Sequence, residues 1–492
     1  PGFEKAYLMA SSHTLGVRET RRLAGRYVLR GREAIECVPF PDTVAQGSYM
    51  IDIHDPQGKR KAIGGKLKKP CYSIPYRCLL PKTVKNLLVC GRCISVDHIA
   101  HASTRIQGTC ILTGQAAGTA AAMAKTQDWE PARLAAEELR RLGLDSVQAE
   151  NGRVLFQGGQ EAMAMANLWL RTGERVLLRL AKGPARSFEE LFQIVATTPL
   201  EEVIPRDGKF PVKGHSLNSQ LHSVPDCQAI VKRAAAKRLG AKYGVTWLPE
   251  TGELYQLQFS LMHDEFELFL DTTGPGLHKR GYRAVGNDAP LRETLAAGMV
   301  QLTRYRGRDF FWDPFCGSGT IPIEAALIAK NRAPGLTRGF AVERFAWIDG
   351  TLFPRLRREA PEREYQGDYR ILGSDNDPKC VSLSMANARK AGVGRLIQFR
   401  DADATKASLP AQEGILVCNP PYGQRMLEQR QAQALVQQLG RHLKFADGWK
   451  KYIISSEPEF EHHFGRRADK RRKLYNGMIQ CEYYMYLGGR RK

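Results

Sequence analysis

The sequence predicts an α/β protein whose C-terminal part, residues 284–492, folds as a doubly wound, mostly parallel sheet ending in an antiparallel hairpin. Two observations predict this fold. Short apolar runs alternate with helical stretches throughout residues 284–492, as in repeated strand–helix–strand units. Asn476 and Gly477 then separate two strand-like runs, and Asn-Gly in that setting is a strong signal for a tight hairpin. The residues before 284 predict an α+β module and, ahead of it, a segment that corresponds to only part of a domain.

The chain has 492 residues, enough for about three domains. Its formal net charge of +22 favours a polyanionic partner such as nucleic acid, because neutralised phosphates release counterions. No apolar run approaches the roughly 18 residues that span a bilayer, and no signal peptide is present. We therefore expect a cytoplasmic protein without membrane contact. Since the chain starts with Pro1 and not with Met, we expect its natural N-terminus to lie further upstream.

The 11 cysteines, in a chain without a secretory signal, predict reduced thiols. Cys90 and Cys93 form the only Cys-x-x-Cys pair. A structural zinc site needs a second pair, and Cys71 and Cys78 are spaced poorly for one. The sequence therefore predicts no metal site.

Residues 1–128 predict a short buried strand at residues 86–90 and a helix at residues 108–125. One face of this helix consists of small residues, which usually pack closely against another element and sometimes approach a ligand. The segment resembles the C-terminal part of the FAD-dependent oxidoreductase family. The matching runs lie at residues 16–22, 74–77, 91–95, 100–105 and 114–119.

That family binds the pyrophosphate of FAD with a Gly-x-Gly-x-x-Gly turn, which residues 1–128 lack. We therefore expect no FAD binding and interpret this segment as the remnant of a flavoprotein. Gene fusion, or an error in gene calling, would have joined it to the rest of the chain. The alternative is an FAD-dependent oxidoreductase activity of this segment.

Residues 129–283 predict a small α+β module, with helices at residues 132–142 and 162–170 and a hairpin of strands at residues 254–261 and 266–270. The module resembles the ferredoxin-like plus THUMP region of ribosomal RNA guanine-N2 methyltransferases. The matching runs lie at residues 150–156, 167–172, 220–226 and 274–283.

The THUMP resemblance implies that this basic module holds folded RNA. The candidate contacts are Lys209, Lys213, His215, His222, Lys232 and Arg233. A second basic cluster, near the C-terminus, adds Arg471 and Arg472 as candidates to hold a phosphate backbone. The alternative for each of these residues is an ordinary solvated basic face.

The first chemical motif of residues 284–492 is Asp-Pro-Phe-Cys-Gly-Ser-Gly-Thr-Ile at positions 313–321, between a predicted strand and a helix. Gly317 and Gly319 allow the backbone to come close to a cofactor. A nicotinamide fingerprint would need a glycine where this chain has Pro322. The motif resembles motif I of class I methyltransferases, which implies binding of S-adenosylmethionine. The residues it implies at the cofactor are Asp313, which would face the methionine amino group, Phe315, Gly317, Gly319 and Thr320.

Two further carboxylates follow this motif. Asp375 ends the next predicted strand and can accept both ribose hydroxyls. Asp403 is placed to accept from the adenine amine, although ordinary loop capping is the alternative for it and for Asp401. An insertion at residues 332–368 precedes them, and its aromatic residues predict packing in preference to a lid.

The second motif, Asn-Pro-Pro-Tyr at positions 419–422, follows a predicted strand and indicates a clamp for a planar amine. A guanine amine is a poor nucleophile because its lone pair is delocalised. The Asn419 side-chain oxygen and the Pro420 carbonyl can grip its two protons, and Tyr422 can stack on the base. The prolines fix this backbone beforehand. We interpret Cys316 and Cys418 as small core residues and not as a cytosine-C5 nucleophile.

The resemblance to THUMP-bearing class I RNA methyltransferases covers residues 129–492 and includes Arg292, Glu293 and Thr294, which would contact the cofactor or brace the THUMP junction. It implies methylation of N2 of a guanosine in 23S ribosomal RNA. DNA adenine and protein glutamine methyltransferases share Asn-Pro-Pro-Tyr, and the THUMP-like module argues against both. A non-catalytic RNA-binding role would require a site that does not bind S-adenosylmethionine.

Overall fold

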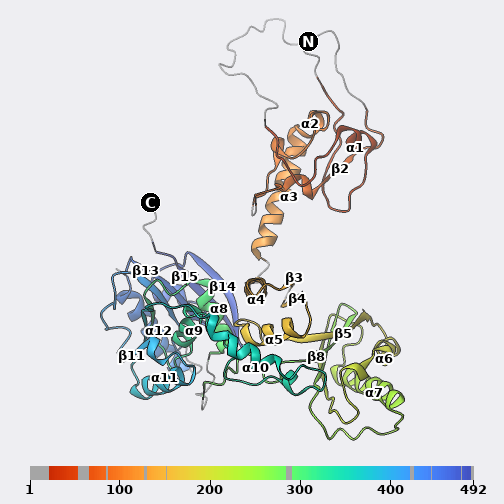
Figure 1. The fold of residues 1–492 in the computed structure, drawn as a ribbon. Helices are drawn as coiled ribbons and strands as arrows, with labels where there is room; N and C mark the ends of the chain where they lie inside the picture. Colours follow the sequence, from red (N-terminus) through yellow and green to blue (C-terminus); the bar gives the residue numbers. More distant parts are fainter. Residues whose placement is uncertain are drawn as a thin grey trace. The chain divides into compact units, whose positions relative to one another are not determined.

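The computed structural model describes residues 21–53, 66–84, 87–126, 130–150, 152–283, 291–421, 426–444, 446–477 and 479–488. The chain forms two compact units, Pro1–Asp128 and Trp129–Lys492 (Figure 1). Among the helices of these ranges, none has the length and apolar character needed to span a bilayer.

The first unit contains three α-helices and one small sheet within its described residues. The helices are α1 (Gly31–Glu36), α2 (His98–Thr104) and α3 (Gln107–Thr126), and β1 (Thr43–Gly47) pairs antiparallel with β2 (Tyr72–Pro75). The prediction of a helix at residues 108–125 is therefore confirmed.

One other prediction for this unit is wrong. Residues 87–90 form no strand: Val89 donates one backbone hydrogen bond to Leu79, no ladder extends from it in the described residues, and Leu87 is 46% exposed. On the small-residue face of α3, Ala117 is buried in the core of this unit, whereas a Cβ added at Gly114 or Gly118 would meet no described atom within 4 Å.

The second unit begins with a ferredoxin-like part, in which α4 (Glu130–Arg141) and α5 (Gln160–Trp169) flank an antiparallel pair, β3 (Asp145–Glu150) and β4 (Arg153–Gln157). A four-stranded sheet follows in the order β5-β8-β7-β6, and only its β6–β7 pair is parallel. Its elements are β5 (Leu177–Pro184), α6 (Phe188–Thr197), β6 (Val212–Leu217), α7 (Val224–Tyr243), β7 (Leu257–Met262) and β8 (Glu265–Asp271). The predicted α+β module is confirmed.

A seven-stranded sheet dominates the rest of the unit, in the order β11-β10-β9-β12-β13-β15-β14. The first five strands are parallel and β15 runs against β13. The strands are β9 (Phe311–Asp313), β10 (Ile371–Asp375), β11 (Ile397–Asp401), β12 (Gly414–Cys418), β13 (Trp449–Ser455), β14 (Lys470–Asn476) and β15 (Ile479–Tyr486). The predicted doubly wound sheet and its closing hairpin are confirmed.

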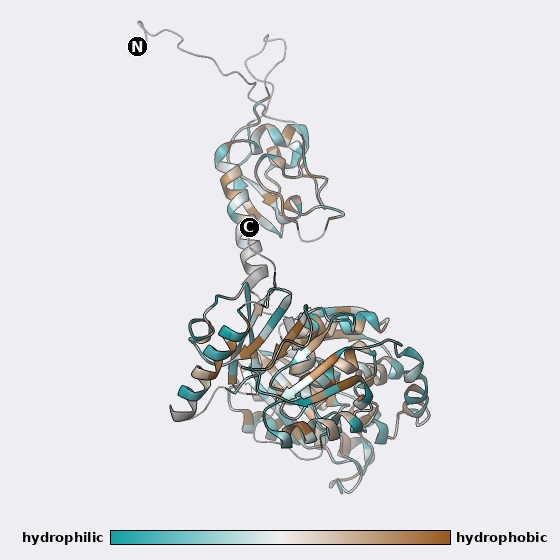
Figure 2. Ribbon diagram, turned by 90° about the vertical axis from the view of Figure 1, so that its left-hand side faces the viewer, coloured by the Kyte–Doolittle hydropathy of each residue, from teal (hydrophilic) through white to brown (hydrophobic). Residues whose placement is uncertain are grey.

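Helices cover both faces of this sheet because its central strands are apolar on both sides. In β12, Ile415 and Val417 join one core cluster while Leu416 and Cys418 join the other. Figure 2 shows these hydrophobic strands as brown arrows inside the unit. The helices are α8 (Glu293–Leu302), α9 (Thr320–Ala329), α11 (Pro378–Lys390), α12 (Met426–His442) and α13 (Phe460–Phe464). Helix α10 (Leu352–Glu359) belongs to the insertion and packs near α5 in a different hydrophobic cluster.

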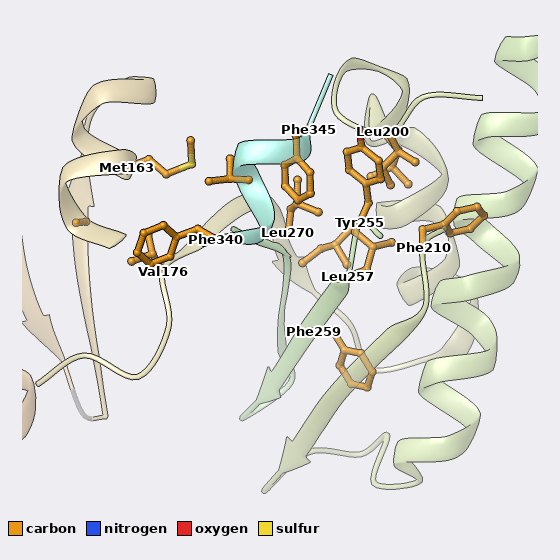
Figure 3. Close-up of a cluster of buried hydrophobic side chains, with 14 of the residues drawn as sticks. Met163, Val176, Leu200, Phe210, Tyr255, Leu257, Phe259, Leu270, Phe340 and Phe345 are labelled. Carbon is orange, nitrogen blue, oxygen red and sulfur yellow. The ribbon is translucent and has the colours of Figure 1, made fainter. Parts of the chain in front are cut away.

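The insertion predicted at residues 332–368 packs against the THUMP sheet, so the prediction of packing is confirmed. Phe345 stacks on Tyr255 with ring centroids 4.4 Å apart, and the backbone N–H of Ala346 donates to the Tyr255 hydroxyl. The Trp347 indole donates to the carbonyl of Val203 at 3.1 Å. Figure 3 shows Phe340 and Phe345 entering the same hydrophobic cluster as Tyr255, Leu257 and Leu270. The insertion thus ties the methyltransferase-like sheet to the module before it.

Replacing Phe345 by alanine is expected to cost about 3–5 kcal/mol of unfolding free energy, because a buried aromatic ring leaves a cavity. Urea unfolding followed by tryptophan fluorescence measures this loss. Phe188→Ala is the matched control, since Phe188 is 39% exposed and should lose less than about 1 kcal/mol. Equal losses for the two variants would contradict the docking role of the insertion.

Candidate cofactor and amine site

The two predicted motifs lie at the topological switch point of the sheet, where the strand order reverses between β9 and β12. From β9 the chain continues to β10 on one side, and β12 lies on the other side. In doubly wound sheets, ligands bind at the carboxyl ends of the strands at such a switch point. Trp312 of β9 pairs with Leu416 of β12, so Asp313 and Asn419 follow on adjacent strands at the same edge.

Asp313 is buried at the end of β9, with 1% of its surface exposed. Its Oδ1 accepts a hydrogen bond from the Phe315 N–H at 3.1 Å, whereas its Oδ2 is buried and has no partner in the described part of the chain. Burial, followed by the nearby charge of Asp375, raises the pKa of Asp313 well above its usual range. A buried acceptor without a donor is costly, which suits a site that receives a cationic group from a ligand.

The glycine turn leaves room for a cofactor beside this carboxyl group. Gly317 has φ +52°, and a Cβ added there would meet open space. Gly319 has φ +81° and lies against α11, where an added Cβ would come within 3.0 Å of Ser384. Gly319 is the N-cap of α9, and the first residue of that helix, Thr320, is buried. Phe315, also predicted at the cofactor, is half-buried at the start of this turn.

Three side chains hold the turn from outside. The Gly317 N–H donates to Asp375 Oδ2 at 2.9 Å, and the other oxygen of Asp375 accepts from the Asp377 N–H. Ser384 donates to the Gly317 carbonyl at 2.8 Å and Asn387 to the Ser318 carbonyl at 2.9 Å. Sequence reasoning missed Ser384 and Asn387, although two polar residues three positions apart share one face of a helix. The Asp375 carboxylate retains further acceptor positions for ribose hydroxyls.

The amine clamp follows β12 directly. The side-chain oxygen of Asn419 is buried and has no hydrogen-bond partner in the described residues, and Pro420 is buried beside it. Tyr422 lies outside the described residues, so its stacking role stays a prediction. Asp313 and Asn419 thus both leave an acceptor oxygen unpaired at this edge of the sheet.

The two cysteines of this region are core residues with inert thiols. Cys418 is fully buried and Cys316 is 5% exposed. Burial, and then the charge of Asp313, raises the pKa of each thiol well above its usual range. A thiolate nucleophile is therefore disfavoured at both positions. Among the described residues, no group of three or more His, Cys, Asp or Glu is arranged to hold a metal ion.

Asp403 has the contacts of a loop cap. Its Oδ1 accepts from the N–H of Thr405 at 2.9 Å and from the Thr405 hydroxyl at 2.7 Å, and Lys406 lies 3.1 Å from its Oδ2. The Thr405 hydrogen bonds are the main cause that lowers the pKa of Asp403 to about 2. Contact with an adenine amine stays a prediction for this residue.

The predicted RNA-binding side chains differ in their surroundings. Lys209, Lys213, His222 and Arg233 are exposed, and His215, also exposed, lies 3.2 Å from the Ser260 hydroxyl. Lys232 instead pairs with Glu250 at 2.6 Å, and Arg471 forms two hydrogen bonds with Glu461. Arg472 is half-buried on β14.

Charge is distributed unevenly among these parts. Residues 185–271 hold 9 lysines and arginines against 12 aspartates and glutamates, whereas residues 272–492 hold 37 against 23. The expectation that the THUMP-like module is basic is therefore wrong for residues 185–271. The positive charge of the second unit lies mainly around the sheet that carries Asp313 and Asn419.

Arg292, Glu293 and Thr294, which match the family sequence, connect the start of α8 to other parts of the second unit. Arg292 lies 3.6 Å from Glu174, and the Thr294 hydroxyl donates to the same carboxylate. Glu293 pairs with Arg283, which also donates to the Thr320 hydroxyl at the start of α9. Of the two roles that the sequence left open, these contacts correspond to bracing.

Four stretches of the chain match family models. Residues 280–485 match the RMKL-like methyltransferase domain. Residues 132–177 match the RlmL ferredoxin-like domain and residues 185–271 the THUMP domain. Residues 1–142 match the FAD dependent oxidoreductase family. The family resemblances expected from the sequence are all confirmed.

Two curated relatives cover the second unit. The putative RNA methyltransferase YpsC of Bacillus subtilis is 43% identical over 354 residues, which are 71% of this chain and 92% of YpsC. The ribosomal RNA large subunit methyltransferase K/L of Psychromonas ingrahamii is 33% identical over 355 residues, which are 70% of this chain and 47% of the relative. The chain thus spans about half the length of the K/L protein.

Two solved structures are similar over most of their own length. One is a predicted N6-adenine-specific DNA methylase from Listeria monocytogenes, 41% identical, with a TM-score of 0.69, covering 73% of this chain and 93% of that chain. The other is SMU.472, a putative methyltransferase complexed with SAH, 39% identical, with a TM-score of 0.67, covering 74% of this chain and 97% of that chain. This chain therefore belongs to the RMKL-like methyltransferase family, whose cofactor is S-adenosylmethionine.

Proposed function

We propose that this protein is a cytoplasmic RNA methyltransferase that modifies N2 of a guanosine in 23S ribosomal RNA. One observation carries the proposal. At the switch point of the sheet, two neighbouring strands end in buried acceptor oxygens without a donor in the described residues, Asp313 Oδ2 and Asn419 Oδ1. The first suits the ammonium group of the cofactor and the second suits the protons of an amine substrate.

The residues have separate tasks in this proposal. When bound, S-adenosylmethionine supplies a methyl group activated by its sulfonium. Asp313 would hold the amino end of the cofactor, the backbone at Gly317 and Gly319 would lie close to it, and Asp375 would accept hydrogen bonds from its ribose hydroxyls. The Asn419 side-chain oxygen and the Pro420 carbonyl accept hydrogen bonds from the two N–H groups of the guanine amine, which directs the nitrogen lone pair out of the ring plane. The prolines hold these acceptors in place before the substrate arrives, so little reorganisation is needed.

RNA is supported as the substrate by three observations. A THUMP domain matches residues 185–271, and the matched relatives are named as RNA and large-subunit ribosomal RNA methyltransferases. The excess of basic residues in 272–492 favours phosphate contacts near the site. The Listeria structure carries the name of a DNA methylase, which makes DNA adenine the competing substrate to test.

The test is transfer of label from tritiated S-adenosylmethionine to ribosomal RNA from a strain that lacks the modification. Label is expected in N2-methylguanosine after digestion to nucleosides, and Asn419→Ala should slow its appearance by about 10²–10³-fold. Duplex DNA and glutamine peptides are the parallel substrates. Label in N6-methyladenine, or in guanosine at a position other than N2, would contradict the proposal.

Residues 1–128 are absent from this mechanism. A purified protein of residues 1–492 is expected to lack the visible absorbance of a flavin, because these residues contain no Gly-x-Gly-x-x-Gly turn. A yellow preparation with one flavin per chain would instead support the oxidoreductase alternative for this segment.

A further inference from the structure

Trp247 is exposed to a degree that is unusual for tryptophan. It lies in the loop between α7 and β7 with 74% of its surface exposed, the highest value among the large hydrophobic residues that the structure describes. Trp169, Trp312 and Trp449 are all buried, with at most 6% exposed. Leaving an indole in water forgoes the free energy of burying it, so an exposed tryptophan beside a depression is a candidate binding residue.

The indole borders a depression of about 520 Å³ that is also lined by Arg206, Asp207 and Pro249. Backbone hydrogen bonds hold its two loops together: the Gly252 N–H donates to the Asp207 carbonyl at 2.8 Å, and Lys209 exchanges bonds with Glu253 and Tyr255. Tyr255 in turn belongs to the buried cluster of Figure 3. The depression is therefore formed on a firm base before any ligand binds.

The polar side chains in this depression are unpaired. Within the described part of the chain, the guanidinium of Arg206 and the carboxylate of Asp207 form no hydrogen bond or ion pair, and both residues are exposed. The depression thus offers an unpaired nucleobase the indole face of Trp247, the guanidinium donors of Arg206 and the carboxylate acceptor of Asp207. The ring can stack on the indole, while its edge presents acceptors to arginine and donors to the carboxylate.

The net negative charge of residues 185–271 favours base stacking over phosphate contacts as the way this module binds RNA. Residues 185–271 carry more acidic than basic side chains, so phosphate neutralisation by this module as a whole is weak. Base–aromatic stacking contributes about 1–3 kcal/mol per base without any phosphate contact. A THUMP domain of this composition would therefore bind RNA by stacking on an unpaired nucleobase.

We propose that Trp247 stacks on an unpaired nucleobase of the RNA substrate and that Arg206 and Asp207 contact the edge of that base. This inference rests on the proposed function, because it takes RNA as the substrate. It adds a positioning site on the THUMP domain that is separate in residues from Asp313 and Asn419.

The experiment uses full-length protein and protein-free 23S ribosomal RNA fragments that the wild type methylates. Trp247→Ala is expected to weaken RNA binding about 5- to 150-fold, as one lost stacking contact implies. The slope of log affinity against log salt should stay unchanged, whereas loss of a phosphate contact would reduce it by about one. Trp247→Phe should retain most of the affinity, and Tyr365→Ala, at an aromatic residue that is 62% exposed, should retain all of it.

Tryptophan fluorescence gives a second measurement beside the RNA affinities. RNA binding should quench wild-type tryptophan fluorescence, and Trp247→Phe should remove most of that quenching while S-adenosylmethionine affinity stays unchanged. If the wild type methylates RNA but Trp247→Ala binds it as tightly, the inference is wrong and the proposed function stands. An effect of Trp247→Ala confined to reactions containing ribosomal proteins would show a protein partner and also overturn it. If the wild type methylates no RNA, the proposed function and the inference about Trp247 are both wrong.

Discussion

Asn419→Ala is expected to lower kcat for RNA methylation by about 10²–10³-fold, while the Kd for S-adenosylmethionine stays within about twofold. Removal of one preorganised polar group that stabilises a transition state has an effect of this size. The oxygen of Asn419 is buried without a partner in the described residues, and the two prolines that follow restrict the backbone beside it. Because the amine needs this acceptor chiefly while its nitrogen becomes tetrahedral, the loss should appear in kcat more than in KM.

Single-turnover methylation and cofactor titration separate the two quantities. Gln437→Ala is the matched control, because it also removes a carboxamide group. Gln437 is exposed on α12, has no task in the proposed mechanism, and lies in a helix that alanine suits. Thermal unfolding of both variants checks that each remains folded. An Asn419→Ala protein with wild-type kcat, or with its whole defect in cofactor affinity, would remove Asn419 from the chemistry.

The site was predictable from the sequence to the extent that short-range patterns determine it. Strands β9 and β12 are apolar runs that end in a polar residue, and parallel strands place their carboxyl ends at one edge. Asp313 and Asn419 could therefore be brought together without coordinates. The hairpin of β14 and β15 followed from Asn476 and Gly477 in the same way.

Long-range contacts were not predictable in this way. Lys232 looked like an RNA contact, yet its ammonium group pairs with Glu250. Residues 86–90 had the composition of a strand, but a strand needs a neighbouring strand, and sequence composition does not reveal whether one is present.

Asp313→Asn is expected to weaken S-adenosylmethionine binding about 150- to 5000-fold. The substitution keeps the shape of the side chain but leaves the cofactor ammonium without its buried counter-ion, a loss of about 3–5 kcal/mol. Asp309→Asn is the control, because Asp309 is exposed and should keep wild-type affinity. Cofactor affinity from calorimetry measures both, and a change of less than tenfold in Asp313→Asn would place the ammonium elsewhere.

The same carboxyl group should make cofactor binding depend on pH. Burial raises the pKa of Asp313 in the free protein, so the group keeps its proton at pH values where an ordinary aspartate is ionised. An ammonium ligand binds the ionised form, hence affinity should increase as pH rises, by up to about tenfold per pH unit below that raised pKa, and then level off. In this window binding releases one proton, which calorimetry in buffers of different ionisation enthalpy detects. Asp313→Asn should bind with no proton release over about pH 5–7, below the titration of the cofactor amine. Equal proton release by the wild type and Asp313→Asn would assign the titration to another group.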